Sequence, residues 1–521
     1  MAHRAQPLGA AHWAGAAVAA LVLVAILGPL GAVLWRADGV GALGPADLAA
    51  IRFTIWQALL SALFSVALAI PVARALARRR FRGRAALIAL MGAPFILPVI
   101  VAVLGLVAIF GRQGLLNAGL AAIGMHGIEI YGLHGVVLAH VFFNLPLAVR
   151  LIMQGWLAIP AERFRLAATL GFTSRDIVRH MERPMLRQVL PGAFLVIFLI
   201  CTTSFAVALI LGGGPRSTTV ELAIYQAFRY DFDLGRAALL GLVQVAICVV
   251  AGLLVLRVAL PGGMGSGLDR PLQRFDAQGG WQRAGDMLAI TLAAAFLLLP
   301  LGAVFLRGIN GVAGLPVSVW QAAERSVILS LATAAIAVAL ALPMALLIAR
   351  GRAKGLLETI GALSIAVSPL VIGTGLFLIL RPHVAPGNSA LPVTGLVNAL
   401  SALPFLLRAL VPAIEAAEAG YGRLAQSLGM SAAQRMRHVL LPRIRRPLGF
   451  GAGLAAAMAM GDLGVITLFA TPQSGTLPLE MFRLMGSYRT DDAEAAALVL
   501  LVLSLALFWI FDRGGRVNAA T

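Results

Sequence analysis

Cysteine, lysine and charged residues in general are scarce in this sequence. Its 521 residues include 2 cysteines, Cys201 and Cys248, so no disulfide framework is expected, and neither has a histidine or carboxylate spaced to form a metal site. The only lysine, Lys354, does not follow the Gly-x-x-x-x-Gly sequence of a phosphate-binding Walker A loop. Charged residues make up 12% of the chain, against roughly 25% in an ordinary soluble domain. These shortages exclude a soluble enzyme and an ATP-hydrolysing subunit.

Hydrophobic residues, in contrast, make up 60% of the chain and are gathered into long runs. A membrane-spanning helix needs about 20 mostly apolar residues, and twelve runs are long enough. We therefore expect an all-α polytopic membrane protein with about twelve transmembrane helices. The runs cover residues 12–35, 53–77, 85–110, 134–156, 189–211, 237–258, 286–307, 324–349, 356–380, 394–411, 447–470 and 493–512.

Basic residues outnumber acidic ones by 41 to 22, and most of them fall between runs on one side of the expected membrane. By the positive-inside rule that side is cytoplasmic. An even number of spans then places both termini in the cytoplasm. A nucleic-acid partner would need a basic, water-exposed domain, and no loop is long enough to form one. The densest basic run contains Arg74, Arg78, Arg79, Arg80, Arg82 and Arg84.

The second half of the chain repeats the first. A shift of 258 residues places Gly171 on Gly429 and Pro184 on Pro442. Six spans in each copy make the two copies parallel, related by an axis along the membrane normal, with a substrate path expected between them. We therefore predict a first repeat over residues 1–258, a cytoplasmic linker over 259–285 and a second repeat over 286–521.

The two copies match best in a cytoplasmic loop, which covers residues 157–188 in the first copy and 412–446 in the second. Glycine suits the left-handed end of a helix. Thr173 and Ser431 each precede an acidic or amide residue by three positions, as in a capping box. We predict a helix, a glycine turn and a second helix in both loops. The residues concerned are Arg165, Leu166, Ala167, Gly171, Thr173, Val178, Met181 and Pro184, and in the second loop Arg423, Leu424, Ala425, Gly429, Ser431, Met436, Val439 and Pro442.

The second helix of each loop is predicted to be short and amphipathic. Pro184 and Pro442 would end it after about ten residues, or about 15 Å at 1.5 Å per residue. Apolar residues three positions apart, such as Val178 and Met181, would form an exposed stripe. Such a stripe fits docking of a soluble partner at two equivalent places. A helix lying on anionic lipid would show the same pattern, and the spacing alone leaves both interpretations open.

Few polar side chains are predicted at membrane depth. Asp462 is the one carboxylate that we place well inside a span, and its repeat equivalent is Ser204, which precedes Phe205. A charge at this depth costs about 2.5–3.5 kcal/mol on insertion scales, so it faces either a translocation path or a hydrogen-bonding partner. His140 and Asn144 lie one turn apart and, with Ser204, Phe205 and Asp462, are candidates for the translocation path. For this pair interhelical hydrogen bonding fits better than a metal site or proton relay. No metal site is predicted.

Both loops resemble the EAA loop of permease subunits in binding-protein-dependent ABC importers, where a proline follows the glycine thirteen residues later. The family's glutamate six residues before the glycine is replaced here by Arg165 and Arg423. The resemblance implies that each loop couples the membrane subunit to one of two copies of a cytoplasmic ABC ATPase. It also implies a periplasmic substrate-binding protein. ATP and Mg²⁺ would be bound by the ATPase. This chain would hold no cofactor and would not itself be an enzyme.

Within that family the whole chain is similar to the thiamine importer permeases, which implies inward movement of thiamine or its phosphate esters. Fused iron(III) importer permeases share the length and plan and are the main alternative. A proton-coupled secondary transporter also has twelve spans in two parallel halves, but it would need titratable groups along its path. The similar segments are 111–114, 138–146, 211–215, 218–226, 230–231 and 486–489.

Overall fold

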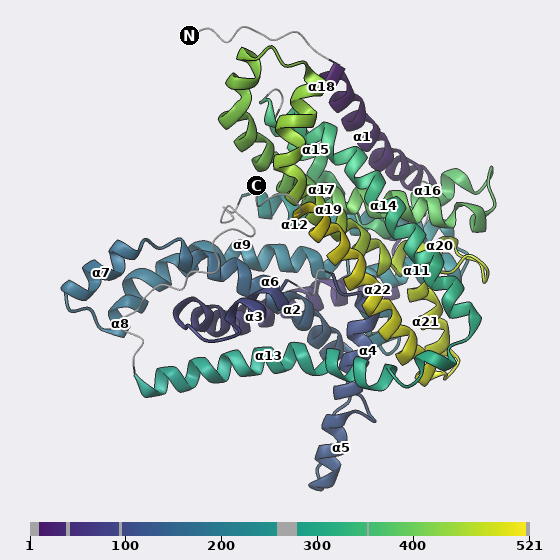
Figure 1. The fold of residues 1–521 in the computed structure, drawn as a ribbon. Coiled ribbons are helices and arrows are strands. Elements are labelled where there is room, and N and C mark those ends of the chain that lie inside the picture. The colour runs from purple at the N-terminus through teal and green to yellow at the C-terminus, as the bar shows by residue number, and fades with distance from the viewer. Residues whose placement is uncertain (1–9, 38–41, 93–95, 258–278, 352–353, 517–521) are drawn as a thin grey trace.

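The computed structural model of the protein describes residues 10–37, 42–92, 96–257, 279–351 and 354–516. Within these ranges every regular element is helical, as the sequence predicts (Figure 1). The first half of the chain forms α1 (Ala10–Ala37), α2 (Pro45–Arg78), α3 (Arg84–Leu90), α4 (Val99–Phe110), α5 (Leu115–Ala122), α6 (Leu133–Leu157), α7 (Ala161–Thr169), α8 (Ser174–Ile177), α9 (Arg183–Thr202), α10 (Phe205–Leu211), α11 (Val220–Arg229) and α12 (Leu234–Leu256). The second half forms α13 (Gly280–Gly308), α14 (Val317–Ala349), α15 (Lys354–Ala366), α16 (Pro369–Leu380), α17 (Pro386–Ser427), α18 (Ala432–Arg435), α19 (Leu441–Met460), α20 (Gly464–Phe469), α21 (Leu477–Gly486) and α22 (Thr490–Arg516).

The long helices account for the predicted spans. Among the described residues, ten helices are long and apolar enough to cross a membrane, and the bent pair α15 and α16 would make an eleventh. Helix α19 occupies the predicted run at 447–470, and arginines near its start make it less apolar than the others. The structure is therefore that of a polytopic α-helical membrane protein, with a helix at each of the twelve predicted runs.

Two element boundaries differ from the sequence prediction. Helix α17 continues to Ser427, well into the predicted loop 412–446, because Ala- and Glu-rich sequence extends a helix even where it is too polar for the membrane. Helix α13 begins at Gly280, inside the predicted linker 259–285, and residues 258–278 lie outside the described part of the chain. Hydropathy marks the apolar part of a helix, not its ends.

Several spans are broken rather than continuous. Pro98 is the N-cap of α4, and Pro369 is the first residue of α16, which is bent by 83° from α15. Proline therefore interrupts the third and ninth predicted runs; Pro94, which is also in the third run, lies outside the described residues. The fifth and eleventh runs are also broken, between α9 and α10 and between α19 and α20. Broken helices expose backbone groups where the two halves meet.

The first helix of each half packs against the other half. Helix α1 contacts α14, α15 and α16, and α13 contacts α2 and α4. Ile26 of α1 is buried in the apolar cluster of the second half, and Leu297 of α13 is buried in that of the first. Each half thus packs its first helix, α1 or α13, against the other half. The order of the apolar runs along the chain does not reveal this exchange of helices.

Two glycines make the exchange possible. The backbone of Gly105 in α4 meets the carbonyl of Pro300 in α13, so closely that a Cβ there would lie 2.5 Å from the oxygen. In the other half, Gly375 of α16 meets the carbonyl of Pro29 in α1, where a Cβ would lie 2.3 Å from the oxygen. Small residues let helix backbones approach in membranes, and here they do so at equivalent places in the two halves.

Candidate functional site

The glycine turns of the two loops have the predicted conformation. Gly171 has φ +68° and Gly429 has φ +63°, the left-handed region that glycine adopts at little cost. In the first loop the amide of the residue after the glycine donates to the carbonyl of Ala167 at 2.9 Å, and in the second it donates to Ala425 at 3.0 Å. These bonds close the helix in the manner of a Schellman motif.

The capping boxes are also confirmed. The hydroxyl of Thr173 accepts a bond from the amide of Asp176 at 3.4 Å, and the Asp176 carboxylate accepts from the Thr173 amide at 3.0 Å. Ser431 and Gln434 exchange the same two bonds at 3.3 and 2.9 Å. Each box therefore satisfies two backbone donors at the start of the second helix of its loop.

The predicted end of the second helix at proline is wrong. Helix continues from Ser174 through Pro184 to Thr202 in the first loop, and through Pro442 in the second. A single π-helical turn precedes each proline, over Val178–Glu182 and Met436–Leu440. The wider π turn has room for the proline ring and tolerates its missing N–H. Each short helix is thus continuous with the long apolar helix that follows it.

The expected exposed stripe on the second helix is only partly present. Val178 is exposed, but Met181 and Met436 are half-buried and Val439 is buried. The reason is the continuous helix, which turns most of this face toward its own bundle. The stripe is therefore mainly a packing surface.

Exposed apolar side chains lie instead on the first helix of each loop. Leu166 and Leu170 occupy successive turns at α7, and Leu424 and Leu428 occupy successive turns at the end of α17. All four are between 55% and 63% exposed. They match under the 258-residue shift, and their i, i+4 spacing was visible in the sequence, although only Leu166 and Leu424 were predicted.

Each loop is fixed to its bundle by a different ion pair. In the first, buried Glu182 binds Arg74 at 2.9 Å and accepts a bond from Trp156 at 3.3 Å. In the second, Glu418 pairs with Arg435. The arginines that replace the EAA glutamate, Arg165 and Arg423, are exposed in the described structure.

The two loops lie far apart, while the opposite ends of the halves converge. Figure 1 shows α7 and α8 at one corner of the molecule and α18 at another, whereas α11, α16 and α20 gather on the far side. Helix α16 contacts α12 and α20, and α11 contacts α20. The halves are therefore splayed at the loop end and closed at the other.

Aromatic rings fill the closed end. The ring centroid of Phe377 in α16 lies 4.5 Å from that of Phe228 in α11 and 5.5 Å from that of Phe469 in α20. Phe205 and Tyr225 of the first half stack edge-on at 5.3 Å nearby. All five rings are buried, so they seal the junction between the halves.

Asp462 and Phe205, predicted from opposite halves, are brought together at this junction. A Cβ on Gly464 would lie 3.7 Å from the Asp462 carboxylate and 3.7 Å from the Phe205 ring. Asp462 is half-buried and accepts a bond from the Ile466 amide at 3.3 Å, so it caps α20. Ser204 is the N-cap residue of α10 at the equivalent break. The carboxylate thus has a local partner and still lies between the halves.

His140 and Asn144 lie elsewhere, inside the first bundle. The His140 Nδ1 atom is 3.2 Å from the Ser61 hydroxyl, and Asn144 donates to the His140 carbonyl at 2.8 Å. The Asn144 amide also lies 3.4 Å from the Cys201 sulfur. These contacts fit the interhelical hydrogen bonding that the sequence favours.

Sequence reasoning missed Glu221, a buried carboxylate of α11. It is the second residue of α11 and is buried, close behind the N-cap Thr219. The first amide of α11, that of Val220, donates to the Thr54 hydroxyl at 2.9 Å. The sequence signal that could have revealed Glu221 was an acidic residue within an apolar segment that is too short to count as a span.

Comparison with known proteins identifies the chain. The family described as "Binding-protein-dependent transport system inner membrane component" matches residues 337–516. A thiamine transport system permease protein of Escherichia coli is 40% identical, with all of both chains aligned. The corresponding permeases of Brucella abortus and Haemophilus influenzae are 40% and 34% identical, over 89% and 88% of this chain and 87% of theirs. The chain belongs to this permease family. It is a multi-pass protein of an inner-membrane transport family whose members are permeases rather than enzymes, and the second loop lies within the matched region.

Proposed function

We propose that this chain is the translocation subunit of an ABC importer that moves thiamine or its phosphate esters into the cell. The similarity of the entire chain to thiamine transport permeases carries the proposal. The same similarity argues against a proton-coupled secondary transporter. Fused iron(III) permeases remain the alternative that an experiment must separate.

The junction between the halves supports a cationic aromatic substrate. Thiamine is a flat aromatic cation, which acidic and aromatic side chains attract through charge and cation–π interaction. Asp462 lies beside Phe205, and Phe205 packs edge-on against Tyr225, so one carboxylate and two rings lie near the meeting point of α10, α11 and α20. Glu221, four residues before Tyr225 in α11, adds a second buried carboxylate. A hard trivalent ion such as iron(III) favours several close oxygen ligands, which two separated carboxylates do not supply.

The two loops would each receive one copy of a cytoplasmic ABC ATPase, which binds the ATP and Mg²⁺ while this chain binds no cofactor. The exposed leucine pairs, at α7 and at the end of α17, would form the apolar part of each docking surface. A periplasmic binding protein would deliver substrate to the opposite, closed end. In this proposal both termini would lie in the cytoplasm, and the splayed loop end would correspond to a path open toward the cytoplasm.

The decisive experiment is uptake by proteoliposomes that contain this chain, its ATPase and its binding protein, supplied in turn with labelled thiamine and iron(III). We expect ATP-dependent accumulation of thiamine. Accumulation of iron without thiamine would overturn the substrate and leave the permease assignment intact.

A pair of variants tests the path. Asp462→Asn removes the charge but keeps an oxygen that can cap α20, so the fold is retained while thiamine uptake falls roughly tenfold, the effect of losing about 1.4 kcal/mol. Asp231→Asn, at an exposed carboxylate outside the junction, is the control and should transport normally. Equal uptake by the two variants would remove Asp462 from the path.

A further inference from the structure

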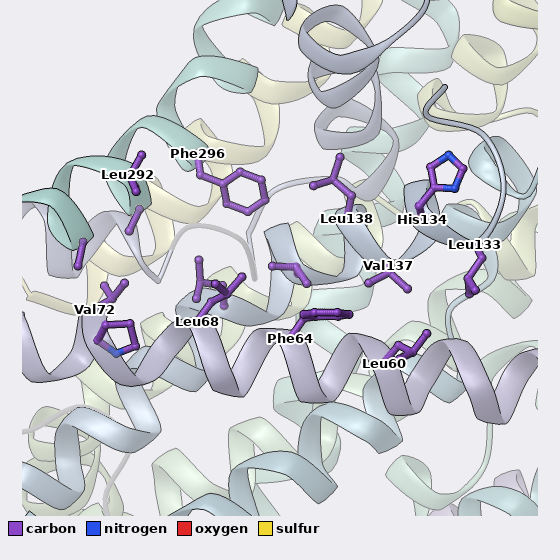
Figure 2. Close-up of a pocket in the computed structure, with 15 residues that line it drawn as sticks. Leu60, Phe64, Leu68, Val72, Leu133, His134, Val137, Leu138, Leu292 and Phe296 are labelled. Carbon is purple, nitrogen blue, oxygen red and sulfur yellow. The ribbon is translucent and has the colours of Figure 1, made fainter. Parts of the chain in front are cut away.

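An apolar groove runs along the outside of the first bundle, between α2, α6 and α13 (Figure 2). Its volume is about 590 Å³. Leu60, Phe64 and Leu68 follow one face of α2, and Leu292 and Phe296 of α13 form the facing wall. Several of these side chains are exposed, so the groove opens to the surface that the bilayer would cover. It exists only because α13 has crossed to the first half without packing fully against α6.

The length of the groove fits one leaflet of a bilayer. The stretch of α2 from Leu60 to Pro71 is about 16 Å long at 1.5 Å per residue. The hydrocarbon core of a bilayer is about 30 Å thick, so one leaflet contributes about 15 Å. A single acyl chain lying along α2 would therefore match the groove from the middle of the membrane to its surface.

A polar cavity of about 390 Å³ continues the groove at the end nearest the first loop. Pro71 lines both spaces. Beyond it stand Arg74 and Arg78 of α2 and Trp281 and Gln282 of α13. Arginine and tryptophan are the residues that meet lipid headgroups at the membrane surface.

Arg78 has a donor without a partner in this cavity. Its side chain is 5% exposed, and its Nε atom binds Asp286 at 2.7 Å, but its Nη1 atom has no hydrogen-bond partner among the described residues. Arg79 shares Asp286, and Arg74 binds Glu182. Three arginines thus face two carboxylates, which leaves an excess of positive charge. A buried guanidinium N–H is satisfied well by an anionic oxygen.

We propose that the groove and the cavity together bind one anionic phospholipid, with an acyl chain along α2 and its phosphate beside Arg74 and Arg78. The lipid would fill the space between α2 of the first half and α13 of the second. It would also lie beside the first loop, because Gln282 of α13 donates to the Ser174 hydroxyl at 3.1 Å. The bound lipid would therefore strengthen the contact between the two halves next to that loop.

The test uses the full-length chain in nanodiscs doped with phosphatidylglycerol that carries a photoreactive diazirine in its acyl chain. After irradiation, adducts are mapped by peptide mass spectrometry. We expect them to concentrate on α2 residues 60–72, α6 residues 133–145 and α13 residues 289–296. Adducts spread evenly over the lipid-facing helices, including the outer face of α1, would show a general lipid annulus and overturn the proposal.

A matched pair of variants tests the groove itself. Leu68→Trp places a large side chain in the groove, whereas Leu63→Trp, on the same helix and equally exposed, lies outside its lining. Leu68→Trp should lower labelling of the groove at least fivefold, and Leu63→Trp should leave it unchanged. Equal labelling of the two variants would contradict occupation of the groove.

The headgroup is tested with a phosphatidylcholine probe that has the same photoreactive chain. Phosphatidylglycerol should label at least fivefold more strongly at equal concentration, and Arg74→Gln should reduce that preference. This variant is preferred to a change at Arg78 because Arg74 is partly exposed and the Arg78–Asp286 pair holds α2 to α13. Arg74 also pairs with buried Glu182, so the variant's thermal unfolding must match that of the wild type before its labelling is compared. Equal labelling by the two probes would show that the groove takes an acyl chain without selecting an anion, and would overturn the assignment of the cavity.

Discussion

The exposed leucine pairs of the two loops are the sharpest test of how the chain would transmit nucleotide state. Leu166 and Leu170 at α7, and Leu424 and Leu428 at the end of α17, are about 60% exposed, and packing within the described part of the chain does not explain apolar residues there. We expect an ATPase to bury them. Replacing both leucines of a loop with glutamine keeps side-chain length and helix propensity while removing the apolar surface.

The size of the effect follows from the exposed area. Full burial of a leucine side chain is worth about 1.5–3 kcal/mol, so burying the exposed 60% of two leucines is worth roughly 1.8–3.6 kcal/mol. Each 1.4 kcal/mol is a factor of ten in affinity, so docking at one loop should weaken roughly 20- to 400-fold. The two loops should respond alike, because their leucines are similarly exposed.

The assay is binding of the purified ATPase to the chain in nanodiscs, together with transport-linked ATP hydrolysis. Leu115→Gln on α5, an equally exposed leucine away from the loops, serves as control. The variants should keep wild-type thermal stability, since changes at exposed positions usually alter it by under about 0.5 kcal/mol. If a protein altered at both loops binds the ATPase and transports normally, the loops are lipid-surface helices and the coupling proposal fails.

Three further predictions concern a glycine turn, a close contact between helices and the sidedness of a loop. Gly429→Val forces a β-branched residue into positive φ, so ATP hydrolysis should lose its link to transport in reconstituted complexes, whereas Gly420→Val, in open space on α17, should retain it. Gly105→Ala drives a Cβ into the carbonyl it meets on α13 and should lower the free energy of unfolding by about 1–3 kcal/mol; thermal unfolding in nanodiscs against Gly302→Ala, which meets nothing, checks this. A cysteine at Leu424 should react with impermeant maleimide only in inside-out vesicles, because the loop is expected on the cytoplasmic side. Both native cysteines are buried and should give no background labelling. Labelling in right-side-out vesicles would reverse the topology.

Local features of this protein were determined by the sequence alone. The spans follow from long apolar runs, and the loop turns follow from glycine at 171 and 429 with a capping box two residues later. The loop turns depend on residues within two or three helical turns of one another, and each span depends on one continuous apolar run, so both can be recognised without knowledge of distant contacts. The 258-residue repeat, which is a property of the sequence itself, likewise establishes that the two loops are equivalent.

Tertiary structure decided the rest, because burial depends on segments that are distant in the chain. Packing against the bundle buried Val439 and left Leu428 exposed, although both are apolar residues of the same loop. The meeting of the two halves placed Asp462 beside Phe205 and buried Glu221. The exchange of α1 and α13 set an acidic residue of the second half against the arginines of α2. The hydrophobic pattern of the sequence cannot predict such an exchange of helices, since α1 and α13 are equally apolar whichever half they pack against.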